Sequence, residues 1–255
     1  MVNLLVAACL ALAVFGCCSD ALRAPRRLTV HSTAPRSSAA LKLAPVEAVE
    51  VAANAASSLV LSAADNAVPS ALAAYGHYFG LVLVTACLTA ERLLIKPSMP
   101  VEQEKLLGNV DLVYGLAATL VLVSGYYRVT EFGKGWDFYQ HEPIFWVKML
   151  LFTVMGASSL LPTIKIVQRA IAINAAENGK GEFPAPMSEK LAKRLTTVVN
   201  GELLAIASIP LAAALMSRGV LYADWFPWQA GAGAVGLGVF GLGFKYTREA
   251  LTWQE

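Results

Sequence analysis

Charged residues are scarce in this 255-residue chain. Lys, Arg, Asp and Glu together make up 15% of the sequence, hydrophobic residues make up 56%, and the mean hydropathy is +0.56. Soluble domains contain about a quarter charged residues, so this composition argues against one. The net charge of +2 is small, and the basic residues lie near the ends of apolar runs. Nucleic acid is therefore not an expected partner.

Cysteine is also nearly absent beyond the N-terminal region. Cys9, Cys17 and Cys18 precede residue 22 and leave Cys87 alone in the remaining chain, too few for an intrachain disulfide or a thiolate metal site. No hydrolase, nucleotide-binding or zinc motif occurs, because the GlyAlaGlyAlaValGly stretch at 231–236 follows no strand pattern. The sequence therefore assigns neither catalytic residues nor a metal site, and it leaves open whether the protein is an enzyme.

What the chain has instead is a series of long apolar runs. A run of about 20 apolar residues can cross the hydrocarbon core as a helix, which satisfies its own backbone hydrogen bonds. The runs are 71–95, 109–129, 143–168, 191–217 and a shorter, glycine-rich one at 228–246. Short connectors and the lack of alternating strand patterns predict an all-α, polytopic transmembrane bundle of about five spans in the lipid bilayer.

The last run carries small residues at helical spacing, namely Ala230, Ala234, Gly238 and Gly241. Such a face lets two helix backbones approach closely. We expect it to pack within the bundle or between subunits, in a homo-oligomer or a larger membrane complex.

The first 70 residues differ from the rest. Residues 1–21 contain a short apolar core followed by small residues, as in a cleavable signal peptide, and residues 22–46 are basic, rich in Ser and Ala, and free of acidic residues. This order is typical of the bipartite leader of a plastid protein. The alternatives are a bacterial lipoprotein leader and a simple signal before a disordered N-terminus. Residues 47–70 read as an Ala-rich linker or a loosely held helix, 71–220 as the transmembrane core, and 221–255 as a C-terminal transmembrane helix with a short tail.

Basic residues are distributed unequally between the two sides of a five-span arrangement. One side holds 11 cations and the other holds 4. The positive-inside bias then puts the connector at 170–190 and the C-terminus on the stromal side of a plastid membrane, thylakoid or envelope, and the mature N-terminus on the opposite side.

Ionisable residues inside the runs are candidate functional residues, because they are costly in a membrane. They form two layers. The layer away from the stroma contains His77, Arg128, Lys148 and Arg218; the stromal layer contains Glu91, Arg92, Asp111, Lys165, Arg194 and Glu202. His77 and Glu91 are 14 residues apart, so they share one helix face but are separated by about 21 Å along it.

Each layer has two interpretations. His77 could ligate haem b while Lys148, Arg128 and Arg218 neutralise its propionates, or these residues could make structural hydrogen bonds and snorkel to the interface. Glu91, Asp111 and Glu202 could form an ion-pair network with Arg92 and Arg194, or bind protons.

Several stretches together resemble a known family. They include TyrGlyHisTyrPheGly at 75–80, AspLeuValTyrGlyLeuAla at 111–117, PheGlyLysGlyTrpAspPheTyr at 132–139 and AlaAlaLeuMetSerArgGly at 213–219. Over about residues 74–220 the chain resembles the predicted membrane protein family of domain of unknown function 2214. The resemblance implies a helical membrane architecture and no particular activity.

A more distant likeness is to the membrane protoporphyrinogen oxidase and copper-resistance membrane protein group. It rests on His77, Trp146 with Lys148, and Arg218. This likeness favours a redox or tetrapyrrole-binding role, whereas charges in both layers without a catalytic set favour small-ion or solute transport, or an assembly factor. Both hypotheses stand at the level of sequence.

Overall fold

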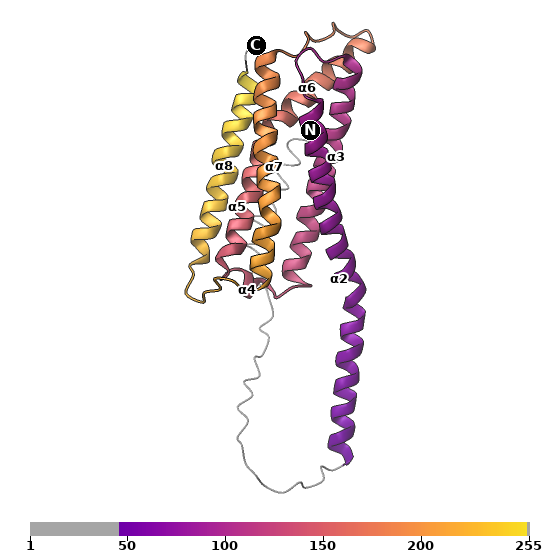
Figure 1. Cartoon of the computed structure of the whole chain (residues 1–255). Helices are drawn as coiled ribbons and strands as arrows, with labels where there is room; N and C mark the ends of the chain where they lie inside the picture. Colours follow the sequence, from indigo (N-terminus) through magenta and orange to yellow (C-terminus); the bar gives the residue numbers. More distant parts are fainter. Residues whose placement is uncertain (1–45, 254–255) are drawn as a thin grey trace.

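The computed structural model describes residues 46–253, and the side chains from residue 66 onward, as helices joined by short connectors (Figure 1). The signal peptide expected at 1–21 and the leader expected at 22–46 lie outside this description, apart from residue 46. The helices are α2 (Val46–Leu94), α3 (Val101–Thr130), α4 (Trp136–Tyr139), α5 (Pro143–Ser158), α6 (Leu160–Glu177), α7 (Glu189–Ser217) and α8 (Trp228–Thr252). No strand occurs in the described range, and the predicted all-α bundle is confirmed.

Four segments of the described chain are long and apolar enough to cross a membrane: Asn66–Leu94, Val101–Thr130, Pro143–Glu177 and Glu189–Ser217. The polytopic character predicted from the sequence is therefore confirmed. α8 is not among these four, although its 25 residues would extend about 38 Å. Its glycines are less apolar than the leucines and valines of the other helices, and the fifth span stays a prediction.

The segment before the first span is helical. Residues 46–70 belong to α2, which continues through Pro69 without a break.

The third span is broken at Ser159 into α5 and α6. Pro162 has no backbone N–H, so the helical hydrogen bond to the carbonyl of Ser158 cannot form. Proline is a common cause of such breaks. The two parts pack differently, because α5 contacts α7 and α8 whereas α6 contacts α3 and α8.

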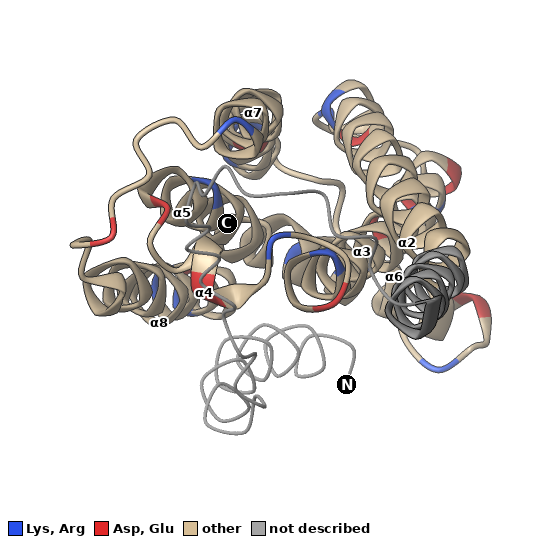
Figure 2. Cartoon of the chain, turned by 90° about the horizontal axis from the view of Figure 1, so that it is seen from below, with Lys and Arg blue, Asp and Glu red and all other residues tan. Residues whose placement is uncertain are grey.

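The helices form two groups that are joined by α6 and α7. α2 packs along α3, and α5 packs between α7 and α8, as the end-on view also shows (Figure 2). The end of the bundle that carries α4 and the α7–α8 connector is called the α4 end below. The opposite end carries the α2–α3 and α6–α7 connectors and the C-terminus, and is called the C-terminal end (Figure 1).

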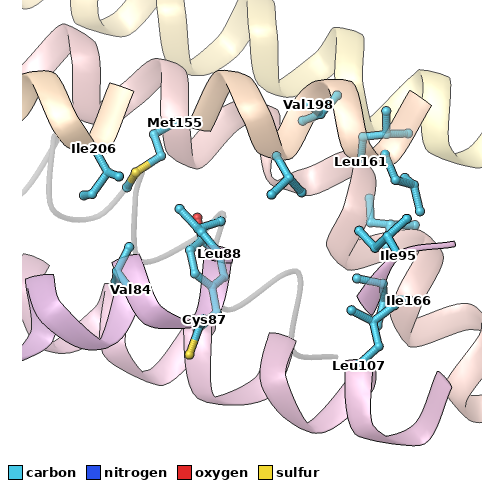
Figure 3. Packing of buried hydrophobic residues seen from close by; sticks show 14 of the residues in the cluster. Val84, Cys87, Leu88, Ile95, Leu107, Met155, Leu161, Ile166, Val198 and Ile206 are labelled. Carbon is cyan, nitrogen blue, oxygen red and sulfur yellow. The ribbon is translucent and has the colours of Figure 1, made fainter. Parts of the chain in front are cut away.

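Buried residues follow heptad-like spacing on the interior faces of the long helices, as in bundles packed knobs into holes. On α7, eight of the buried positions alternate steps of four and three, namely 191, 195, 198, 202, 205, 209, 212 and 216, and the buried residues Ala192, Val199 and Ile206 widen this face. Most are apolar and join one core cluster with α2, α3 and α6, in which Val84, Leu88, Met155 and Ile206 face one another (Figure 3). The exceptions within these stripes are polar, and the ionisable ones among them define the candidate site.

Candidate functional site

Three buried carboxylic acids occupy interior positions of three different helices, and we call Glu91, Asp111 and Glu202 the acidic layer. Glu91 and Glu202 are each 1% exposed and Asp111 is 5% exposed. Glu91 Oε1 and both carboxyl oxygens of Glu202 have no hydrogen-bond partner in the described part of the chain. The charges of Glu91 and Asp111 both act on Glu202, so the three groups share one electrostatic environment.

The ion-pair network predicted for these acids is wrong in its pairings. Arg92 Nε donates to Asn200 Oδ1 at 2.7 Å, and Arg194 Nε and Nη2 donate to the two oxygens of Glu249 at 2.6 and 2.9 Å. Both arginines lie on helix faces where α7 or α8 offers a closer polar partner. Within residues 66–253, none of the four ion pairs includes an acid of the acidic layer.

Neutral polar side chains surround the acidic layer instead. Thr163 Oγ1 donates to Asp111 Oδ1 at 2.7 Å. Tyr114 is buried one turn from Asp111 and lies against Ser159, at the break between α5 and α6. Ser158 lies near Glu202, but its hydroxyl donates to the Met155 carbonyl at 3.0 Å, which leaves the carboxyl of Glu202 without a donor.

These neighbours were not predicted from the sequence. A signal was present, because Tyr114 follows Asp111 by three residues on one helix face and Ser158 and Ser159 interrupt an apolar run just before Pro162. Within the described residues, no group of three or more His, Cys, Asp or Glu side chains has the geometry to hold a metal ion.

A paired acid lies nearer the C-terminal end. Glu104 forms a bidentate ion pair with Arg169, with both N–O distances 2.8 Å, and Arg169 Nη2 also donates to the Ala185 carbonyl at 2.7 Å. Both side chains are largely buried. A buried carboxylate with a counter-ion thus exists in the same bundle, seven residues before Asp111 on α3, which makes the missing cation at the acidic layer a specific property of that layer.

His77, near the α4 end, is held by α3. Its Nδ1 lies 3.0 Å from the Val121 carbonyl and 3.2 Å from Ser124 Oγ. Ser124 donates its own proton to the Leu120 carbonyl at 2.5 Å, and a carbonyl only accepts, so Nδ1 must carry the hydrogen. In the neutral imidazole this tautomer leaves Nε2 as an acceptor or ligand.

Two of the other cations predicted in this layer gather near His77. Arg128 Nη2 donates to the Tyr78 hydroxyl at 3.3 Å, and its guanidinium lies 4.9 Å from the centre of the Tyr78 ring. The charges of Lys148 and Arg128 both act on His77, and that of Arg128 acts on Lys148. We call His77, Arg128 and Lys148 the basic layer.

Arg218 does not join them. It is the C-cap of α7, and its Nη1 donates to the Ala214 carbonyl of the same helix at 3.0 Å. Its charge is not among those that act on His77 or Lys148. The sequence placed Arg218 at the correct end of the bundle, but the C-cap position directs its guanidinium back to its own helix.

Outside the spans, the α4 end contains one buried acid that the sequence analysis did not single out. Glu142 precedes α5, is fully buried, and has no hydrogen-bond partner for either carboxyl oxygen in the described chain. Burial raises the pKa of Glu142, and the charge of Lys134 lowers it in part. Close by, the Tyr222 hydroxyl donates to Asp224 Oδ1 at 2.7 Å, and this hydrogen bond raises the pKa of Tyr222.

Long apolar helices that bury a layer of acids and partly cover a layer of basic side chains define a polytopic helical membrane protein. Residues 69–221, more than half of the chain, match the model of a family described as predicted membrane protein (DUF2214), and the chain belongs to this family. The family resemblance noted in the sequence is thereby confirmed, whereas the distant likeness to the protoporphyrinogen oxidase group gains no support. No curated protein and no solved structure matches the chain significantly.

Proposed function

We propose that this protein carries protons across its membrane, with Glu91, Asp111 and Glu202 as the proton-binding groups. The observation that supports this most is the complete burial of Glu91 and Glu202 without a cation or a hydrogen-bond donor for three of their four carboxyl oxygens. An unpaired carboxylate is very costly in a low dielectric, so such a group is held in its neutral, protonated form. Intramembrane acids of this kind are characteristic of proton relays.

The neighbours of the acidic layer support proton movement between helices. Asp111 accepts from Thr163 on α6, and Tyr114 lies against Ser159 at the break of the third span. Hydroxyl groups both donate and accept hydrogen bonds, so they can pass a proton between carboxyl groups that do not touch. The acids come from α2, α3 and α7, so a small rearrangement of these helices would change which acid water can reach.

The test is proton flux into liposomes that contain the purified full-length chain and a pH-sensitive dye, driven by a potassium diffusion potential. We expect flux from the wild type and at least a tenfold lower rate from Glu202→Gln, which keeps the shape of the side chain but cannot ionise. Glu182→Gln, at an exposed position of the α6–α7 connector, is the matched control and should retain the wild-type rate. A wild type no faster than empty liposomes, or a Glu202→Gln variant as fast as wild type, would reject the proposal.

A second candidate function is haem binding in a redox role, and it has its own observation. The hydrogen bond from His77 Nδ1 to the Val121 carbonyl is the arrangement that orients a histidine for ligation through Nε2. Arg128 and Lys148 could pair with the propionates of haem b, which would supply one-electron chemistry when bound. An absorbance spectrum of oxidised and dithionite-reduced protein from haem-replete cells tests this: a Soret band that is lost in His77→Ala supports it, and a colourless wild type rejects it.

We further propose that the membrane is a plastid membrane, thylakoid or envelope, with the C-terminus in the stroma and the mature N-terminus on the other side. The basic, acid-free stretch at 22–46 and the excess of Lys and Arg at the C-terminal end support this. A C-terminal fluorescent protein should colocalise with plastids and be protected from protease in intact organelles. Assembly with a second copy or with other membrane proteins is a further proposal, which the mass of the detergent-solubilised particle tests.

A further inference from the structure

The basic layer lies apart from the acidic layer and contains three basic side chains from three helices. His77 belongs to α2, Arg128 to α3 and Lys148 to α5. On α2, Val84 and Leu88 lie between His77 and Glu91 in the sequence, and both pack in the apolar core with Ile206 (Figure 3). The basic layer is therefore a distinct local environment, which the proton-binding proposal does not use.

Helix register places Lys148 opposite His77. Met155 packs with Val84 and Leu88 in the core, and α2 and α5 both run from the α4 end towards the C-terminal end (Figures 1 and 3). His77 precedes Val84 by seven residues and Lys148 precedes Met155 by seven residues, so both lie about 10 Å nearer the α4 end on the same helix faces. The charge of Lys148 acts on His77, in agreement with this register.

Nothing in the described chain neutralises these groups. The four ion pairs there involve Lys105, Arg169 and Arg194, and the Lys148 ammonium makes no hydrogen bond or ion pair with the described residues. Arg128 uses one nitrogen on the Tyr78 hydroxyl, which leaves most of its donors for another acceptor. Two cations beside a histidine repel one another unless an anion lies between them.

The layer can be reached from the α4 end. Lys148 is the sixth residue of α5, so it lies about 8 Å from the start of that helix, and Arg128 is two residues from the end of α3. Each of the three residues is partly exposed. This is the depth at which the phosphates of lipid headgroups and dissolved anions both come into contact with a membrane protein.

We infer that His77, Arg128 and Lys148 form a binding site for a phosphate group that enters from the α4 end, either as free phosphate or as the headgroup of an anionic lipid. A planar guanidinium and an ammonium are the usual phosphate ligands in proteins, and His77 offers Nε2 as a donor when it is protonated. The Tyr78 hydroxyl and ring hold the guanidinium of Arg128 beside His77 before the ligand arrives.

The test uses the full-length chain in a neutral detergent, with unfolding followed by tryptophan fluorescence. Inorganic phosphate is titrated against sodium chloride at constant ionic strength. We expect a saturable rise of several degrees in the unfolding temperature of the wild type, at least half of it lost in Lys148→Gln and in Arg128→Gln. Arg218→Gln removes a cation at the same end that bonds within its own helix, and it should keep the full rise.

A second arm distinguishes the two sources of phosphate. The same proteins are placed in nanodiscs of phosphatidylcholine alone or mixed with phosphatidylglycerol. Stabilisation by phosphatidylglycerol but not by free phosphate, lost in Lys148→Gln, assigns the site to a lipid headgroup, and the opposite result assigns it to a soluble anion. If neither probe stabilises the wild type, or if Arg218→Gln loses the effect as fully as Lys148→Gln, the inference is overturned.

The outcome is separable from that of the proton proposal. Glu202→Gln should lose proton flux and keep the phosphate effect, because its carboxyl lies in the acidic layer and its charge does not act on His77 or Lys148. Lost phosphate binding with normal proton flux in Lys148→Gln would confirm that the two layers act independently.

Discussion

The two ends of the bundle use their cations differently. Cations lie over aromatic rings at both ends, as Arg128 does over Tyr78 and Lys190 does over Trp253. The ion pairs of the described residues, however, are all at the C-terminal end, where Arg169 and Arg194 bind carboxylates. Acidic residues are present at both ends, so a lack of carboxylates at the α4 end does not explain the difference. The α4 end is instead built from aromatic packing, in which Trp136, Phe145 and Trp146 contact one another edge to face. We therefore expect the loss of a charge to destabilise the C-terminal end most, and a change in side-chain shape to destabilise the α4 end most.

The largest effect should follow from breaking the buried pair at the C-terminal end. Arg169→Met leaves Glu104 buried without its cation, and we expect the free energy of unfolding to fall by about 3–5 kcal/mol. Arg194→Met removes the cation of a more exposed pair and should cost about 1 kcal/mol or less. Unfolding in detergent measures both, and equal losses would contradict the view that burial sets the strength of these pairs.

At the α4 end, the addition of one methyl group at Gly231 should destabilise the fold. A Cβ at Gly231 would overlap the indole ring of Trp146, so we expect Gly231→Ala to lower the free energy of unfolding by about 1–3 kcal/mol. At Gly233, two residues further on the same helix, a Cβ meets nothing within 4 Å, and Gly233→Ala should be neutral or slightly stabilising. The same unfolding measurement tests this. Equal free energies of unfolding for the two variants would contradict tight packing of α8 on α5.

A smaller loss should follow from removing the hydroxyl that fixes His77. Ser124→Ala deletes one of the two acceptors of Nδ1, at a cost of about 1 kcal/mol. Ser208→Ala removes an exposed hydroxyl that bonds only to its own helix, and serves as the control. Imidazole resonances in the NMR spectrum should shift in Ser124→Ala and not in Ser208→Ala; an unchanged spectrum would show that Ser124 does not hold His77.

The smallest effect concerns Glu142 at the α4 end. Its raised pKa means that the folded protein binds this proton more tightly than the unfolded chain does. The stability that results is fully present below the ordinary carboxyl pKa of 4.5 and is lost as the pH rises through the raised pKa of the folded state. Unfolding temperatures measured across this range should fall with pH in the wild type and fall less in Glu142→Gln. If the unfolding temperatures of the wild type and of Glu142→Gln changed in parallel with pH, burial would not shift the pKa of Glu142.

The sequence predicted the helices because their signal is local. Apolar runs located the four segments that are long and apolar enough to cross a membrane. The helical rise also predicted that His77 and Glu91 lie far apart along one helix, because it depends on sequence spacing alone. The partners of the arginines could not be predicted in this way, because Arg194 meets Glu249 through the rotation of α7 against α8, which no spacing within one helix encodes. Glu142 was missed for a similar reason, since its burial arises from the packing of two connectors at the α4 end.

Ser159 divides the third span into α5 and α6, which have different neighbours. α5 packs against α7 and α8, whereas α6 packs against α3 and α8. Ser158, the last residue of α5, lies near Glu202, and Ser159 lies against Tyr114. A tilt of α6 about Ser159 would therefore change the polar surroundings of the buried acids before it disturbed the aromatic packing at the α4 end.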